Sequence, residues 1–279
     1  MKLTNQSMYI LSFYVTLVIL WFSSSLFATG NAHVDFSTIF SGFKANTQYG
    51  YIFNLLYGFL PFFGGILGIS IAKRWGMFKS SMGKAIFFLS MGSFIWSIGA
   101  FIWAYYNFVV HAAVPYPGFS DVAWIACYPF WGLGVFYLGQ AMYIKLGLRK
   151  VSGKLFIIIL PIIVVASSWY FLVDIARGGS ITSGGGLLKV FFDIAYPTGD
   201  VLILTLAFLI FGFSFLSLGG RYKWPIILIL FGFLFQYLAD FAFSYTTTIN
   251  TYYNGDWVDL LYATSLFILS FGLTLLDND

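Results

Sequence analysis

Glutamate is absent from this chain of 279 residues, and cysteine and histidine are scarce. Every acidic role must therefore fall to the ten aspartates. The single cysteine, Cys127, excludes an internal disulfide, and with only two histidines it leaves no cluster of soft metal ligands. We accordingly expect no metal site and no cofactor.

The common catalytic and nucleotide-binding motifs are also missing. His33 and His111 stand apart from any HExxH pattern, which argues against a metalloprotease. The stretch GMFKSSMGKA has the wrong glycine spacing for a phosphate-binding loop. The sequence therefore predicts a protein that is not an enzyme.

Charged residues make up 9% of the chain and hydrophobic residues 60%, with a mean hydropathy of +0.87. Soluble domains carry about 25% charged residues, so the lipid bilayer is the predicted solvent and partner. The net charge of +4 suggests nucleic-acid binding at first, but the basic residues sit in short clusters between apolar runs. Such clusters are typical of membrane topology signals, and we expect no nucleic-acid partner.

Eight apolar runs are long enough to cross a hydrocarbon core, which takes about 20 residues. They cover residues 8–28, 51–72, 84–108, 121–144, 155–175, 193–217, 224–246 and 257–276. The sequence thus predicts an all-α integral membrane protein with eight transmembrane helices in a single polytopic domain, residues 1–279.

Basic residues indicate the orientation of these spans. Eleven of the fourteen lie near the N-terminus or after the second, fourth and sixth spans, and Lys44, Arg177 and Lys189 lie on the opposite side. The positive-inside rule therefore predicts a multi-pass protein of the cytoplasmic membrane with both termini cytoplasmic. The first run, followed by GNA at 30–32, has an alternative interpretation as a cleaved signal peptide, which would leave seven spans.

The even-numbered spans share an internal repeat. Four tyrosines, separated by 71, 68 and 66 residues, fall in register: Tyr57, Tyr128, Tyr196 and Tyr262. Four positions before each stands an aromatic or apolar residue on the same helical face, such as Trp124 before Tyr128. We interpret the pattern as four repeated helical hairpins, residues 8–72, 84–144, 155–217 and 224–276. For any single ring, an interfacial aromatic belt is the alternative.

Eight of the ten aspartates map to the outer half of this topology. Asp200 and Asp240 lie within or at the edge of spans, where an ionisable group usually faces the bundle interior or a water-filled cavity. A structural hydrogen bond is the alternative for Asp240, and hydration at the interface is the alternative for Asp200. Asp121, Asp193 and Asp259 sit where predicted helices start, so N-capping is their default role.

Together the acidic and aromatic residues predict a polar, aromatic-lined pocket that opens to the outside. Its candidate ligand-binding residues are Trp124, Tyr128, Asp193, Tyr196, Asp200, Asp240, Asp259 and Tyr262.

Four segments resemble the multi-helix membrane regions at the N-termini of many bacterial signalling proteins, which precede diguanylate cyclase, phosphodiesterase or histidine kinase modules. They read PYPGFSDVAWIACYPFWGLG, DIAYPTGDVLILTLA, YLADFAFSYTTT and GDWVDLLYATSLFILSFGL, and the resemblance covers residues 84–276. It implies a sensory or membrane-anchoring role. The positions that match it are Asp121, Tyr128, Tyr196, Asp200, Asp240 and Asp259.

Two features depart from that family. Ala100 and Asn107 stand where the family often has acidic residues, so any role of those acids does not carry over. The sequence also ends at LLDND without an output module, so we expect either a piece of a longer protein or a stand-alone relative.

Three functions fit these observations, and a scaffold or assembly subunit without a ligand is the remaining alternative. The first is a sensory module that binds a small molecule or lipid in the outer pocket and signals to a cytoplasmic partner, to a missing output domain or within a homodimer. The second is a proton- or cation-coupled transporter with Asp200 and Asp240 on the ion path. The third is an intramembrane enzyme acting on lipid or isoprenoid, with the same two residues as a carboxylate pair.

Overall fold

A computed structural model describes residues 3–28, 43, 48–142, 151–175, 178–180, 186–214 and 222–278. Within these residues all regular structure is helical, as the sequence predicts. The long helices are α1 (Asn5–Ala28), α3 (Gln48–Arg74), α4 (Ser81–Tyr105), α5 (Phe119–Ala141), α6 (Val151–Ser168), α7 (Gly186–Ser214), α8 (Lys223–Thr248) and α9 (Trp257–Thr274). Three short segments accompany them: η1 (Met77–Lys79), η2 (Tyr106–Val110) and η3 (Trp169–Ile175).

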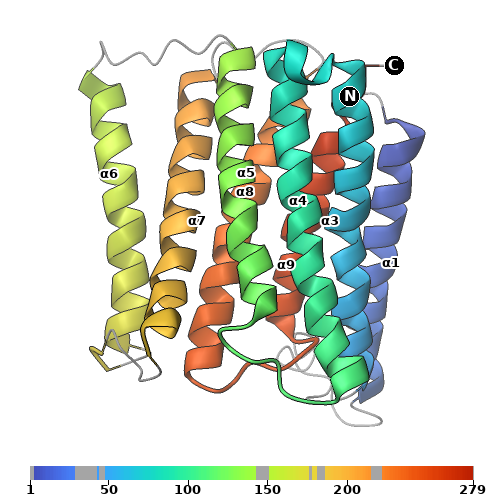
Figure 1. The fold of residues 1–279 in the computed structure, drawn as a ribbon, viewed down its shortest axis with the longest axis vertical. Helices are drawn as coiled ribbons and strands as arrows, with labels where there is room; N and C mark the ends of the chain where they lie inside the picture. The colour runs from blue at the N-terminus through green and yellow to red at the C-terminus, as the bar shows by residue number, and fades with distance from the viewer. Residues whose placement is uncertain are drawn as a thin grey trace.

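The helices stand side by side and run in alternate directions along the chain (Figure 1). α1 and α6 lie at opposite edges of the bundle, whereas α9 lies inside it and packs against α3 and α8. Both chain termini lie at the same end, which we call the terminal end; the opposite end is the far end (Figure 1). Of the residues of α9, 67% are buried, so this helix links the two ends through the interior.

Six helical segments of the described chain are long and apolar enough to cross a membrane: α1, α3, α4 together with η2, α5, α8 and α9. This finding indicates a membrane protein, as the composition predicts. α6 with η3, and α7, contain shorter apolar stretches, Pro161–Ile175 and Thr198–Ile210. Among the described residues, six of the eight predicted spans therefore meet the length and hydropathy that a crossing needs.

The predicted hairpins have partners in contact, but the contacts do not stop at their boundaries. α1 packs against α3, α4 along α5, α6 against α7, and α8 along α9, as the four hairpins require. However, α3 also packs along α4 and α9, and α5 packs along α7, although these helices belong to different predicted hairpins. The core is continuous through the bundle, so packing alone does not divide it into four units.

Two glycines allow large rings of α5 to approach neighbouring helices. A Cβ atom on Gly99 of α4 would lie 2.5 Å from Nε1 of Trp124. A Cβ atom on Gly199 of α7 would lie 2.8 Å from the ring of Tyr128. Both distances are too short for packed atoms, so only glycine leaves room for these rings. The two glycines therefore determine how closely α5 packs between α4 and α7.

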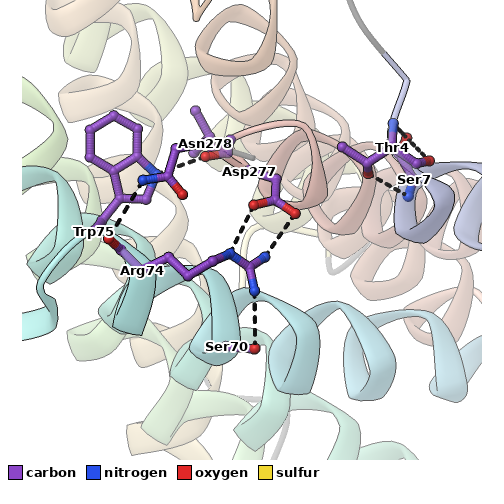
Figure 2. A network of polar contacts seen from close by, with 8 residues as sticks. Thr4, Ser7, Ser70, Arg74, Trp75, Asp277 and Asn278 are labelled. Carbon is purple, nitrogen blue, oxygen red and sulfur yellow. Dashed lines mark hydrogen bonds and ion pairs between the residues drawn. The ribbon is translucent and has the colours of Figure 1, made fainter.

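Polar contacts attach the C-terminal residues to the end of α3 (Figure 2). Nε of Arg74 donates to Oδ1 of Asp277 at 2.9 Å, and Nη2 lies 2.7 Å from Oδ2 of the same carboxylate. Nε1 of Trp75 donates to the carbonyl oxygen of Leu276 at 2.8 Å. Leu276 and Asp277 are both buried. The C-terminal end of α9 is thus held against the α3–α4 connection at the terminal end.

Candidate functional site

A cavity of about 420 Å³ lies among the helices, and its lining includes residues from the first turns of α5 and α9. Both of these helices start at the far end of the bundle (Figure 1). Four aspartates and one lysine line it: Asp121, Asp200, Asp240, Asp259 and Lys189. Thirteen of its lining residues are aromatic: Tyr57, Trp96, Trp103, Tyr116, Trp124, Tyr128, Trp131, Tyr196, Tyr237, Phe241, Phe243, Tyr252 and Tyr262. The lining is therefore both acidic and rich in ring faces.

Helical periodicity brings these side chains to the cavity. α5 contributes Asp121, Trp124 and Tyr128, and α9 contributes Asp259 and Tyr262. Spacings of three, four and seven residues keep side chains on one face of a helix. Each of these two helices thus has a polar and aromatic face at the cavity within an otherwise apolar sequence.

The four tyrosines of the sequence repeat each donate a hydrogen bond to an aspartate of another helix. The pairs are Tyr57–Asp259 at 3.3 Å, Tyr128–Asp200 at 2.8 Å, Tyr196–Asp121 at 2.8 Å and Tyr262–Asp240 at 2.7 Å. Two pairs join α5 and α7 reciprocally, and the others join α3 to α9 and α9 to α8. Hydrogen bonds to a carboxylate are stronger than those between neutral groups, so the pairs both orient the acids and connect the helices.

Asp200 and Asp240 form the centre of the polar network. Both line the cavity, and each accepts a tyrosine hydroxyl, Asp200 from Tyr128 and Asp240 from Tyr262. Nε2 of Gln236 donates to Oδ2 of Asp240 at 3.0 Å, and Oε1 of Gln236 accepts from the Ser265 hydroxyl at 2.8 Å. These bonds connect α8 to α9, and the bond from Tyr128 to Asp200 connects α5 to α7.

Two aspartates organise the start of α9. Asp256 is the N-cap, and its Oδ1 accepts from the backbone amide of Val258 at 2.8 Å. Asp259 accepts from the backbone amide of Gly255 at 2.5 Å and from the Tyr252 hydroxyl at 3.2 Å. Burial raises the pKa of Asp256 to about 6. Burial, and then the neighbouring charge of Asp259, raise the pKa of Tyr252 well above its ordinary value, so its hydroxyl stays a donor.

The aromatic side chains form a continuous wall around Trp96. The centroid of its ring system lies 5.9 Å from those of Trp124 and Tyr262, and 6.2 Å from that of Tyr57. Trp103 extends the wall, because its ring lies 5.7 Å from that of Trp124. Separations of about 4.5–7 Å are those of interacting aromatic pairs. Rings from α3, α4, α5 and α9 therefore pack into one surface.

One acceptor at the cavity has no hydrogen-bond partner. Oδ1 of Asn254 accepts from Nδ2 of Asn54 at 2.7 Å and from Nε1 of Trp103 at 2.8 Å. These bonds orient the Asn54 amide with its nitrogen toward Asn254. Asn54 lines the cavity and is 4% exposed, and its Oδ1 is buried without a partner. A buried carbonyl oxygen in this state is destabilising unless a donor reaches it.

Seven of the eight predicted site residues line this one cavity: Trp124, Tyr128, Tyr196, Asp200, Asp240, Asp259 and Tyr262. The eighth, Asp193, belongs to α7, but its side chain lies outside the described residues. Asp240 accepts a hydrogen bond from Tyr262 of a neighbouring helix, which is the structural alternative given for it above. It also lines the cavity.

The predicted N-capping roles are wrong in detail. The cap of α5 is Gly118, and Asp121 accepts from the backbone amide of Gly118 at 2.7 Å from within the first turn. The cap of α9 is Asp256, one turn before Asp259. α7 begins at Gly186, so Asp193 lies inside the helix. α5 and α7 extend further toward the N-terminus than their apolar runs do, whereas α9 begins at Trp257, as its run does, and is capped by the residue before it.

Sequence reasoning misses several residues of the site. Tyr57 and Asn54, three residues apart on α3, both line the cavity, and the repeat register already pointed to that face. Trp96 lies seven residues before Trp103, and Gln236 lies four residues before Asp240. Helical spacing from a neighbouring residue of the cavity lining would thus have identified Trp96 and Gln236.

The described part of the chain contains no group of three or more His, Cys or Asp residues arranged to hold a metal ion. Cys127 is buried, and its thiol donates to the carbonyl oxygen of Trp124. Comparison with protein-family models, curated proteins and solved structures finds no match for the chain.

Proposed function

We propose that the protein is a membrane sensory module that binds a small molecule or lipid in the far-end cavity and signals to a partner, an output domain or a second copy at the terminal end. The observation that carries the proposal is the convergence of seven separately predicted residues on one cavity of about 420 Å³. Cavities of about 300–1,000 Å³ with apolar walls and a few polar groups are typical ligand sites.

The course of α9 supports a coupling between the two ends. Its first turns supply Asp259 and Tyr262 to the cavity, and the residues after its last turn include Asp277, which pairs with Arg74. A helix that is mostly buried transmits a displacement along its length, because its packed neighbours resist bending. A ligand that moves the start of α9 would therefore alter the contacts of its end.

The proposed topology has all eight long helices crossing the membrane as four repeated hairpins, with both termini cytoplasmic. The alternating helix directions and the shared end of the termini support it (Figure 1). Four lysines also lie at or next to the ends of α3, α4 and α8 at the terminal end: Lys73, Lys79, Lys84 and Lys223. A basic end is the cytoplasmic end by the positive-inside rule, and the cavity would then face the outside.

The presence of Asp200 and Asp240 in one cavity favours a second candidate, a proton-coupled transporter. Carboxyl groups inside a transmembrane bundle can take up and release protons along an ion path. In proteoliposomes, a transporter would accumulate a bound ligand only when a proton gradient is applied. A sensory module would bind the same ligand without accumulating it.

The first test is native mass spectrometry of the 279-residue chain in mild detergent. We expect a discrete extra mass that is lost on activation. The variant Ser244→Phe places a ring at the cavity lining and should abolish that mass. Thr16→Phe, on the exposed face of α1, is the matched control and should keep it. A bare chain, together with no stabilisation by a panel of small molecules, would contradict the proposal.

A further inference from the structure

The cavity has an excess of acidic groups that the protein itself does not neutralise. Four aspartates and one lysine line it. Among the described side chains, one ion pair has its nitrogen and oxygen atoms within 4.0 Å of each other, Arg74–Asp277 at the terminal end. Lys189 therefore forms no such pair with the described aspartates of the cavity. A buried acidic group keeps its proton when it has no cationic partner, and a positive charge from elsewhere stabilises its ionised form.

The tyrosine hydroxyls at the site do not meet that need. Each register tyrosine donates to one carboxyl group, which orients the group, but a phenol brings no positive charge. Asp200 and Asp240 accept such bonds from Tyr128 and Tyr262, and neither forms an ion pair with a described basic side chain. The rings around Trp96 line the same cavity as these acids.

Two further features define the ligand chemically. Faces of tryptophan and tyrosine within about 6 Å attract a cation, and organic ammonium ions are typical ligands of such aromatic enclosures. Asn54 lines the same cavity, and its Oδ1 is a buried acceptor without a partner, which calls for an N–H or O–H donor. An ammonium group that keeps N–H bonds satisfies the acids, the rings and this acceptor at once.

We propose that the cavity binds an organic ammonium ion, a protonated primary or secondary amine attached to an apolar body. The inference rests on the proposed function, because it names the ligand class of the same cavity. The volume of about 420 Å³ exceeds what a bare ammonium ion fills, and the aromatic lining provides the surface that an apolar body covers.

Three probes with the same phenyl ring and different head groups test the proposal: 2-phenylethylamine, protonated at pH 7, 2-phenylethanol, which is neutral, and phenylacetate, which is an anion. Isothermal titration calorimetry on the full chain in lipid nanodiscs gives the Kd of each. We expect the Kd of the amine to lie at least about tenfold below that of the alcohol. Phenylacetate should bind more weakly than either, because the site is acidic.

The matched variants remove acids from the cavity lining. Replacing either Asp200 or Asp240 alone leaves the other acid at the cavity. The double variant Asp200→Asn/Asp240→Asn removes both and should raise the Kd of the amine about tenfold without changing that of the alcohol. Asp174→Asn, at an exposed aspartate of η3 outside the cavity lining, should change neither.

The outcomes separate the two proposals. Equal binding of the alcohol and the amine, or an amine Kd that the double variant does not change, would overturn the ammonium inference and leave the ligand-binding function standing. If none of the three probes binds and the chain carries no extra mass in native spectra, both proposals fail. If the double variant does not fold, Asp259→Asn, which removes a separate acid from the lining, serves in its place.

Discussion

The hydroxyl group of Tyr128 lies 2.8 Å from Oδ1 of Asp200, and this bond joins α5 to α7 beside the cavity. The reverse bond, from Tyr196 of α7 to Asp121 of α5, is also 2.8 Å long. Asp121 and Asp200 are both buried, so they have lost most of their hydration and depend on such donors. The relative position of these two helices is therefore maintained by hydroxyl groups as well as by ring packing.

Tyr128→Phe isolates the contribution of the hydroxyl. The ring stays in place, and a buried carboxyl group loses a donor, so the free energy of unfolding should fall by about 1.5–3 kcal/mol. Denaturant or thermal unfolding in detergent measures the change. Tyr9→Phe is the control, because Tyr9 is 75% exposed, and it should have little effect. Equal stability of the Tyr128 variant and the wild-type protein would mean that only the ring matters.

Gly92 tests the close packing of α4 on α5. A Cβ atom at this position would lie 2.4 Å from Cδ1 of Trp131, a fully buried side chain, so Gly92→Ala must displace the ring or the helix. Overpacking of this kind costs about 1–3 kcal/mol. Gly132→Ala is the matched control on α5, since a Cβ atom there meets nothing within 4 Å. Gly92→Ala should unfold at a lower temperature than Gly132→Ala, and the reverse order would contradict this packing.

The fold could be predicted from sequence to the extent that it depends on local composition. The run at 224–246 corresponds to α8 at Lys223–Thr248, because apolar residues and helix coincide there. The start of α7 could not be found in this way. Hydropathy places it at 193, but the helix begins at Gly186, and its first turns include Lys189 and Asp193. Hydropathy detects where a helix is apolar, not where it begins.

The site could be predicted one helix at a time but not as a set of pairs. Spacing and charge identify Asp121 and Tyr196 as unusual residues of their own segments. They lie 75 positions apart in the chain, and their hydrogen bond depends on α5 packing against α7. No local pattern specifies which helices become neighbours. The default N-capping role of Asp121 was incomplete for the same reason, since the carboxyl group serves both its own helix and a tyrosine of another.

Asp256 makes stability depend on pH at the start of α9. Burial raises the pKa of this group from 3.8 to about 6, so between these values the folded protein holds a proton that the unfolded chain has lost. The resulting contribution to stability is fully present below about pH 4 and is lost as the pH rises through about 6. Tyr57, Tyr252, Tyr253 and Asp259 are the titratable groups that interact with it.

The variant Asp256→Asn keeps a side-chain oxygen for the cap and removes the titration. Relative to this variant, the wild-type protein should lose thermal stability between pH 4 and pH 7. Melting temperatures of both proteins at intervals of half a pH unit measure the difference. A difference that stays constant over this range would show that Asp256 titrates normally in the folded protein.

The contact between Arg74 and Asp277 makes a last prediction about the terminal end. Both oxygens of Asp277 face the guanidinium group, and Arg74 is 28% exposed, so solvent weakens the pair. A double-mutant cycle with Arg74→Gln and Asp277→Asn should give a coupling energy of up to about 1 kcal/mol, as expected for a partly exposed pair. Lys79→Gln, which removes an exposed charge at the same end, is the control and should show no coupling to Asp277→Asn.

Arg74→Gln and Asp277→Asn should also speed hydrogen exchange of the backbone amides at residues 275–278, because the pair holds this segment against α3. Unchanged exchange in Asp277→Asn would mean that burial of Leu276 is sufficient to hold the segment and that the ion pair does not restrain the end of α9.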